Sequence, residues 1–191
     1  MVITKPTSPG GSFKPHPEGI HPAVLVGVID QHKHQTEYQG RQKSVQKLRL
    51  VFETEAPTDD GRRCTVSKSF TASLHEKSRL FEFVSKWFGR PPTGDLDLNA
   101  LKGKCCTLVI SHQEGQSGKI YANIDAVSKP TKKLEPSGSY DEAAEQERYD
   151  EWYKKNVPTG HFVATPAPQA KPAPKPAPAP AVVDNSDDVP F

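Results

Sequence analysis

Residues 44–55 read S-V-Q-K-L-R-L-V-F-E-T-E, and this stretch indicates which class of fold the chain adopts. Its apolar and basic side chains alternate, with Leu48, Leu50 and Phe52 on one parity and Lys47 and Arg49 on the other. Because successive side chains of a strand point to opposite faces, this alternation predicts a β-strand with one buried apolar face. Its basic face should lie outward in solvent, as is common in antiparallel sheets.

The preceding sequence predicts a partner strand and a loop. A-V-L-V-G-V-I-D at 23–30 is a continuous apolar run of the kind found in buried strands, and Gly27 within it indicates a bulge or bend. The polar residues 31–43 then predict a loop that turns at Gly40. The chain should therefore enter the strand at 44–55 from a long connection.

The following sequence predicts a hairpin and then a helix. An Asp-Gly pair at 60–61 is a hairpin signal, so residues 63–72 should return as a third strand. Ser73 and Glu76 fit a capping box for a helix that ends at Gly89. The large apolar residues of this helix recur at helical spacing and should pack on the core: Leu80, Phe81, Val84, Trp87 and Phe88.

Two more strands are predicted at 104–112 and 119–127. In the second, the two faces should divide as Ile120, Ala122, Ile124 and Ala126 against Lys119, Tyr121 and Asn123. Three strands, a helix and two strands is the element order of the OB-fold, a small five-stranded barrel that binds oligonucleotides or oligosaccharides. We therefore expect a mainly β protein with an OB-fold barrel. A five-stranded sheet plugged by one helix in another topology is the alternative.

Composition indicates that only part of the chain forms this barrel. Hydrophobic residues make up 34% of the sequence, below the roughly 45–50% of folded domains, and there are 19 prolines. The charged segment at 140–156 is predicted to be helical, and its Tyr149, Trp152 and Tyr153 would dock on the barrel, form a recognition element or order only with a partner. The predicted parts are a flexible N-terminal arm (1–19), an OB-fold domain (20–133), a charged helical extension (134–163), an Ala/Pro-rich linker (164–183) and an acidic tip (184–191).

Charge is distributed unevenly between the two ends of the chain. Residues 1–133 hold 20 basic and 13 acidic side chains, a net charge of +7, whereas residues 134–191 hold 5 basic and 10 acidic side chains, a net charge of −5. A basic domain followed by an acidic tail is typical of proteins that bind a polyanion. A mildly basic surface without such a partner is the alternative.

Several functional classes are disfavoured by missing patterns. No run of about 18 apolar residues and no signal pattern occurs, so we expect a cytoplasmic protein with no membrane association. The three cysteines form neither a CxxC pair nor a spaced Cys/His quartet, which argues against a metal site. None of the common nucleotide-binding or hydrolase motifs is present, so we expect no cofactor and no enzymatic activity.

The last eight residues read D-N-S-D-D-V-P-F and resemble the acidic C-terminal tip of bacterial single-stranded-DNA-binding proteins, which ends in aspartates followed by Ile-Pro-Phe. Such a tip would place its terminal ring in an apolar pocket of a partner, where an arginine pairs with the carboxylate and a basic rim attracts the aspartates. An acidic solubility tail is the alternative. The predicted partner-binding residues are Asp184, Asp187, Asp188, Val189, Pro190 and Phe191.

The middle of the chain resembles small phage and prophage proteins of the OB type, on the stretches H-P-A-V-L-V-G-V-I-D, S-K-S-F-T-A-S-L-H-E-K-S-R-L and K-I-Y-A-N-I-D-A-V. The W-x-x-V-x-F-type strand signature of ordinary bacterial members is absent, which leaves open whether the chain forms a homo-oligomer. The resemblance implies single-stranded DNA binding in phage replication, recombination or repair inside the bacterial host cytoplasm, with the tip binding replication or recombination proteins.

Binding of single strands requires cations for phosphates and aromatic faces for bases. The predicted DNA-binding residues are Lys33, Tyr38, Arg41 and Lys43 in the expected loop, Lys47 and Arg49, Lys68 and Phe70, and Lys119 and Tyr121 on the flanking strands. Phe70 shares its parity with Val66, so a place in the core is equally compatible with the pattern. Two other functions remain open: an OB adaptor that binds protein without DNA affinity, and a single-strand annealing recombination protein.

Overall fold

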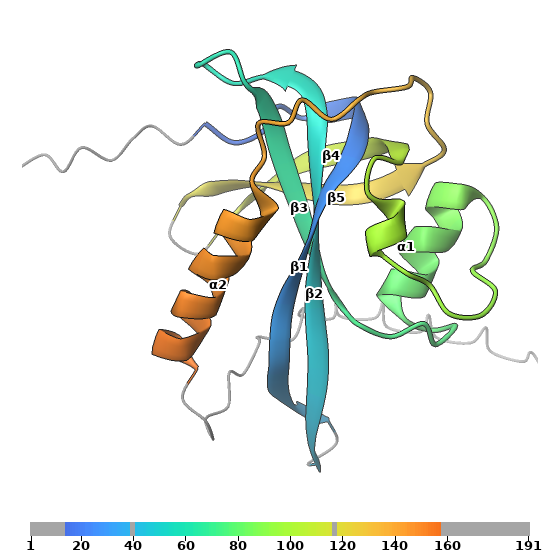
Figure 1. Ribbon diagram of the computed structural model, residues 1–191, viewed down its shortest axis with the longest axis vertical. Coiled ribbons are helices and arrows are strands. Elements are labelled where there is room, and N and C mark those ends of the chain that lie inside the picture. The colour runs from blue at the N-terminus through green and yellow to red at the C-terminus, as the bar shows by residue number, and fades with distance from the viewer. Residues whose placement is uncertain (1–13, 39–40, 116–117, 158–191) are drawn as a thin grey trace, which may run out of the picture.

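The computed structural model describes residues 14–38, 41–115 and 118–157, which form one five-stranded antiparallel sheet and two α-helices (Figure 1). The hydrogen-bonded order of the strands is β3-β2-β1-β4-β5. The mainly β class, the five strands and the helix between the third and fourth strands are confirmed. The elements are β1 (Gly19–Tyr38), β2 (Arg41–Pro57), β3 (Arg63–Thr71), α1 (Arg79–Phe88), the 3₁₀ turn η1 (Asn99–Leu101), β4 (Cys105–Glu114), β5 (Ile120–Ser128) and α2 (Glu142–Asn156).

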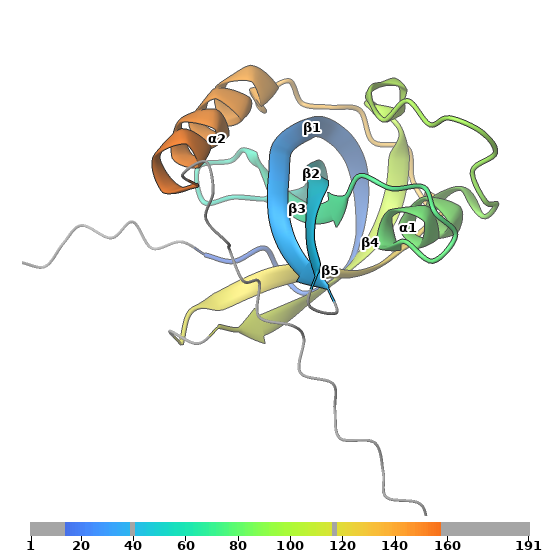
Figure 2. The ribbon, with the colours of Figure 1, turned by 90° about the horizontal axis from the view of Figure 1, so that it is seen from below.

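Strand β1 is the centre of the sheet and curves strongly along its length (Figure 2). Its first residues, Gly19 to Val24, pair with β4, whereas the part from Ala23 to Tyr38 pairs with β2. Two register shifts interrupt the pairing with β2, one between Leu25 and Gly27 and one between Asp30 and Lys33. The bulge expected at Gly27 is confirmed. Beyond Val24 no strand of the described residues pairs with the β4 side of β1, so this edge is left for another element to cover.

Helix α1 closes the core beneath the sheet. Leu80, Phe83, Val84 and Trp87 are buried, and the Trp87 indole donates from Nε1 to the backbone carbonyl of Cys105 at 2.7 Å. The predicted core role of the helix is confirmed, although Phe83 rather than Phe81 belongs to the fully buried set. Large buried residues of the strands complete the core: Leu25, Leu50, Phe52, Phe70, Leu108, Ile110, Ile124 and Val127.

The predicted start of α1 is wrong by five residues. The N-cap is Ser78, whose Oγ accepts a hydrogen bond from the backbone N–H of Phe81 at 3.2 Å. Ser73 instead accepts a bond from the N–H of His75, and the N–H of Ser78 donates to the carbonyl of His75, so this stretch forms a local turn. Serine side chains stabilise such turns as readily as helix caps. The end at Gly89 is confirmed, because its φ of 67° is left-handed.

Two strand predictions also need correction. The expected loop at 31–43 is instead the far part of a long β1–β2 ribbon, in which pairing continues as far as Tyr38 opposite Arg41. In β5 the alternation changes at Asp125, because Ile124 and Ala126 pair with the adjacent residues Ile110 and Val109. This bulge turns Val127 rather than Ala126 into the core. Bulges add one residue and reverse the parity beyond it, which a period-two pattern does not reveal.

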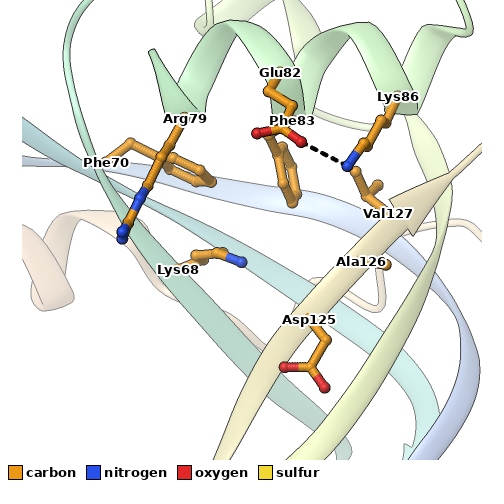
Figure 3. A pocket seen from close by; sticks show the side chains of 9 residues that line it. All are labelled: Lys68, Phe70, Arg79, Glu82, Phe83, Lys86, Asp125, Ala126 and Val127. Atoms are coloured by element: carbon orange, nitrogen blue, oxygen red, sulfur yellow. Dashed lines mark hydrogen bonds and ion pairs between the residues drawn. The ribbon is translucent and has the colours of Figure 1, made fainter. Parts of the chain in front are cut away.

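The two edge strands, β3 and β5, approach each other under α1 (Figure 3). The side chain of Lys68 on β3 donates to the backbone carbonyl of Ile124 on β5 and lies over the ring of Phe83 at 5.9 Å. A cavity of about 240 Å³ opens between the two strands and the helix. Burial lowers the pKa of Lys68, against a smaller raising effect from Asp125.

Candidate nucleic-acid interface

The outward face of β2 carries a row of basic residues. Lys43, Lys47 and Arg49 share one parity of the strand, opposite to that of the buried Leu48 and Leu50. Arg41 has the same parity, although its side chain lies outside the described part of the chain. Alternate residues of a strand are about 6.6–6.8 Å apart, and Val45 occupies the position between Lys43 and Lys47, so the row consists of two groups of cations separated by one apolar residue. Lys43 is exposed, and Lys47 is half-buried.

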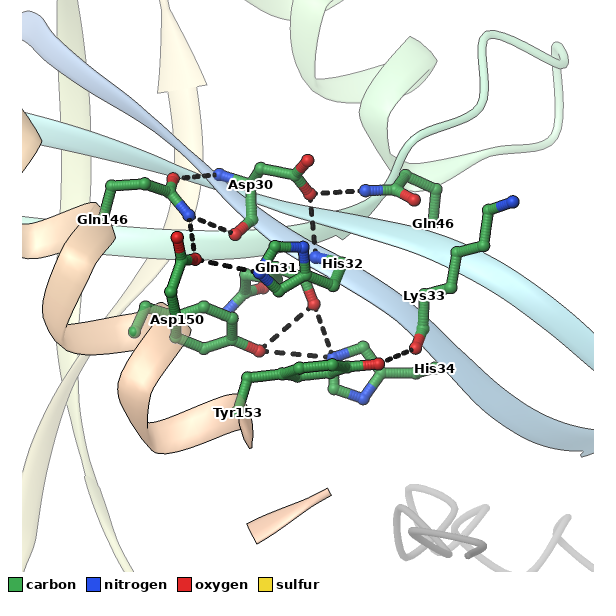
Figure 4. A network of polar contacts seen from close by, with 10 residues as sticks. Asp30, Gln31, His32, Lys33, His34, Gln46, Gln146, Asp150 and Tyr153 are labelled. Atoms are coloured by element: carbon green, nitrogen blue, oxygen red, sulfur yellow. Dashed lines mark hydrogen bonds and ion pairs between the residues drawn. The ribbon is translucent and has the colours of Figure 1, made fainter. Parts of the chain in front are cut away.

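The ribbon separates residues that the sequence placed together in one loop. Thr36 pairs with Lys43, so this pair lies on the same face as the row, and Tyr38 pairs with Arg41 through the backbone, their side chains lying outside the described part of the chain. Lys33 pairs with Gln46 and belongs to the opposite face. Figure 4 shows the Lys33 side chain directed away from α2. The predicted loop site is therefore a strand face that includes Lys43 and excludes Lys33.

Helix α2 covers the edge of β1 that β4 leaves unpaired. Glu142 accepts a hydrogen bond from the backbone N–H of Val28 at 2.9 Å. The side-chain amide of Gln146 accepts from the N–H of Asp30 at 2.8 Å and donates to its carbonyl at 3.0 Å (Figure 4). These side chains satisfy strand groups that would otherwise lack a partner. No residue of α2 is buried, so polar contacts dominate its attachment.

The bulge in β1 provides the second half of this attachment. His32 has a φ of 56°, the one described non-glycine residue with a positive φ, and its Nε2 lies 2.8 Å from Asp150 Oδ1. The hydroxyl of Tyr153 donates to the carbonyl of Lys33 at 2.5 Å. The hydroxyl of Tyr149 donates to the carbonyl of Gln31 at 3.2 Å. The left-handed residue thus turns carbonyls of β1 toward the tyrosines of α2.

His34 lies at the centre of this network. Its Nε2 is 2.8 Å from the carbonyl of Gln31 and 3.2 Å from the hydroxyl of Tyr149. Burial lowers the pKa of His34, and the positive charge of Lys47 lowers it further, against the opposing effect of the bond to Gln31. Because the pKa of His34 is lowered, its imidazole is neutral, and because Nε2 donates to the carbonyl of Gln31, the proton lies on Nε2.

The end of the basic row is covered by α2, contrary to the expected solvent-exposed face. Arg49 forms a 2.6 Å ion pair with Glu145, and its guanidinium lies 5.9 Å from the centre of the Tyr149 ring. Its side chain is only 23% exposed. Nearby, Lys102 pairs with Glu142 at 2.6 Å. The acidic first half of α2 therefore uses Arg49 for docking, and Lys43 and Lys47 remain as the accessible described members of the row.

Four other predicted DNA-binding residues lie away from the row. Phe70 is 4% exposed, and its ring packs against Phe83 at a centroid distance of 5.0 Å, so the stacking role is wrong and the core role is correct. Lys68 lies in the cavity between β3 and β5. Lys119 precedes β5, and the exposed Tyr121 packs over Gly115 in the β4–β5 hairpin. The six predicted tip residues from Asp184 to Phe191 lie outside the described residues.

The aromatic residues of α2 were not among the predicted DNA-binding residues. Tyr149 and Tyr153 dock on β1, whereas Trp152 is 49% exposed. A tryptophan two residues before a pair of lysines, near the end of a polar helical segment, was the signal in the sequence that would have identified it. The structure links this exposed residue to the basic row through Tyr149, whose ring lies 5.5 Å from the Trp152 ring and 5.9 Å from the guanidinium of Arg49.

Comparison with known proteins leaves the chain without an assigned family: no family model and no curated protein matches it. None of the helices in the described segments is long and apolar enough to cross a membrane. Within residues 14–38, 41–115 and 118–157, no group of three or more His, Cys, Asp or Glu side chains is placed to hold a metal ion.

Proposed function

We propose that this protein binds single-stranded DNA without sequence preference, along the outward face of the β1–β2 ribbon. The observation that carries the proposal is the set of cations on the outward face of β2, to which the exposed Trp152 of α2 is linked through the ring of Tyr149. Lysine and arginine neutralise phosphates irrespective of base sequence, and binding then releases counterions. Aromatic faces accept any base by stacking.

The arrangement of elements supports an OB-type barrel as the scaffold of this function. The chain order β1-β2-β3-α1-β4-β5 and the approach of β3 and β5 under α1 are the features that such a barrel requires. OB-folds bind single strands on the face of their second and third strands, between the loops that follow the first and fourth strands. The basic row belongs to the second strand of the chain, which supports this face as the proposed site.

The C-terminal tip gives the proposal a biological setting. Its resemblance to the tips of bacterial single-stranded-DNA-binding proteins supports a non-enzymatic role in phage or prophage replication and recombination, in the cytoplasm of a bacterial host. The tip, Asp184 to Phe191, would recruit replication or repair proteins to DNA that the domain has bound. An aspartate cluster before a terminal phenylalanine suits a basic partner surface with an apolar pocket.

Fluorescence anisotropy of a labelled oligo-dT across a salt series tests the proposed function. We expect tight, salt-sensitive binding, with weaker binding to duplex DNA. The double substitution Lys43→Ala and Lys47→Ala should weaken binding at every sequence tested. It should also reduce the salt slope by about 1.4, since each contact with a single strand contributes roughly 0.7.

The matched control removes two exposed lysines elsewhere, Lys77 and Lys133. This variant has the same net charge as the first, so an equal loss of affinity in both would show a general charge effect and contradict the proposed face. No binding of the intact chain at low salt would contradict the function itself and favour a protein-binding adaptor. Faster pairing of complementary strands would indicate an annealing protein.

A further inference from the structure

The two halves of α2 differ in charge and in contacts. The first half is acidic, and Glu142 and Glu145 pair with Lys102 and Arg49 of the domain. The second half ends in Lys154 and Lys155, which are exposed. Neither lysine forms an ion pair within the described residues. The helix is therefore anchored by its acidic half and presents a basic end to solvent.

Trp152 lies in the second half and contributes little to docking. Its ring is 49% exposed and contacts Tyr149 at a centroid distance of 5.5 Å, with the planes tilted by 36°. Tyr149 in turn lies over Arg49 of the basic row. Trp152 is thus the outermost ring of a stack that begins on the outward face of β2. Burial of an indole usually stabilises a fold, and here about half of the ring remains available to a ligand.

We propose that the second half of α2 forms the second wall of the DNA-binding groove, in which Trp152 stacks on a base and Lys154 and Lys155 contact phosphates. The proposal rests on the proposed function and deepens it, because it names the residues that hold bases. The anchored half fixes the helix against β1, so the Trp152 ring is positioned before the strand arrives. Such preorganisation reduces the entropy lost on binding.

The ligand chemistry follows from the two walls together. Lys43 and Lys47 lie on the ribbon, and Lys154 and Lys155 follow Trp152 within three residues at the end of the helix, so both elements that would contact the strand carry cations. A duplex buries its bases in the stack, whereas a single strand offers their faces to a side chain. The wall should therefore favour single strands over duplexes by means of Trp152, and charge alone would not provide this preference.

The two tryptophans of the chain make this proposal directly measurable. Trp87 is 1% exposed in the core, whereas Trp152 is 49% exposed, so iodide in solution should quench mainly Trp152. We expect oligo-dT to quench the intrinsic fluorescence and to protect the remaining emission from iodide. The substitution Trp152→Phe should abolish this change and retain most of the affinity, because phenylalanine still offers a face for stacking.

The substitution Trp152→Ala should lower the affinity for oligo-dT about 5- to 150-fold, the range for loss of one stacked base. It should have little effect on an oligonucleotide of the same length whose sugars lack bases. Ile20→Ala is the matched control: Ile20 is 71% exposed at the other end of β1 and should leave both affinities unchanged. Circular dichroism should show that all three variants are folded.

The outcomes separate the two proposals. Suppose that the intact chain binds oligo-dT without a change in fluorescence and that Trp152→Ala binds it equally well. The proposed role of the second half of α2 is then wrong, and the proposed function stands. Equal losses for the oligonucleotides with and without bases would also overturn the stacking role. If the intact chain does not bind oligo-dT, the proposed function itself is contradicted, whatever the role of α2.

Discussion

Helix α1 packs against the core with four buried apolar side chains, whereas helix α2 lies along the edge of β1 with none. Helix α1 is held by the burial of apolar surface: Leu80, Phe83, Val84 and Trp87 fill the space under the sheet. The second is attached by polar contacts to backbone groups and charged side chains of the domain. Apolar burial stabilises without a specific geometry, while polar docking fixes position and orientation at small net gain.

This difference assigns the two helices separate tasks. Loss of α1 should unfold the domain, because its side chains are part of the only described core cluster. Loss of α2 contacts should leave the sheet folded and displace Trp152 and Tyr149 from the basic row. The experiments that follow test this division, beginning with the largest expected effect.

The substitution Trp87→Ala should lower the free energy of unfolding by about 3–5 kcal/mol, the range for truncation of a buried aromatic residue. Trp87 is 1% exposed, and its Nε1–H bond to the carbonyl of Cys105 would also be lost. Urea unfolding followed by circular dichroism provides the measurement. A change below about 1 kcal/mol would show that the core depends on α1 no more than on α2, and would contradict the proposed division of tasks between the two helices.

The substitution Gly27→Ala should loosen α2 at a cost of roughly 1–3 kcal/mol, the range for overpacking. A Cβ at Gly27 would lie 2.6 Å from Cε1 of Tyr140, just before the helix begins. Amide hydrogen exchange should become faster in residues 142–156 and remain slow in α1. Uniformly faster exchange would mean that α2 and the core unfold together.

Acidification should weaken α2 docking, the smallest of the three effects. His34 is neutral in the docked state because burial and Lys47 lower its pKa, so release of the helix raises its affinity for protons. Docking is then fully present above the ordinary histidine pKa of about 6.5 and declines as the pH falls below it. Exchange in α2, corrected for its intrinsic pH dependence, measures this effect. His34→Gln should remove it, and a persistent effect in that variant would implicate other groups.

Sequence pattern predicted the parts of the fold that burial determines. The alternation around Leu50, the spacing of Leu80 and Trp87, and the left-handed end at Gly89 each follow from local chemistry. The pattern did not reveal the ribbon beyond Asp30, where both faces are polar and pairing depends on the neighbouring strand. The bulge at Gly27 was predicted from its glycine, but the pattern did not reveal the register shifts between Asp30 and Lys33 of β1 and at Asp125 of β5, where no glycine marks the inserted residue.

The sequence predicted which basic residues belong to the candidate site, but it did not predict how they are arranged in space. Arg41, Lys43, Lys47 and Arg49 were selected for their charge, and only the continuous strand β2 shows that they form one line. The cover over Arg49 depends on contacts between residues about 100 positions apart in the chain, which no local pattern encodes. Trp152 was considered only as a docking or recognition residue of the extension.

Lys68 has a consequence for behaviour at high protein concentration. The edges of β3 and β5 do not pair with a further strand in the described residues, and unpaired edges promote aggregation by adding strands from other molecules. An inward-pointing lysine on an edge strand is one of the devices that discourage such growth. Lys68 occupies this position between the buried Val66 and Phe70 and already uses its ammonium group to cap the carbonyl of Ile124. We therefore expect the side chain that spans the gap between the edges also to oppose polymerisation through them.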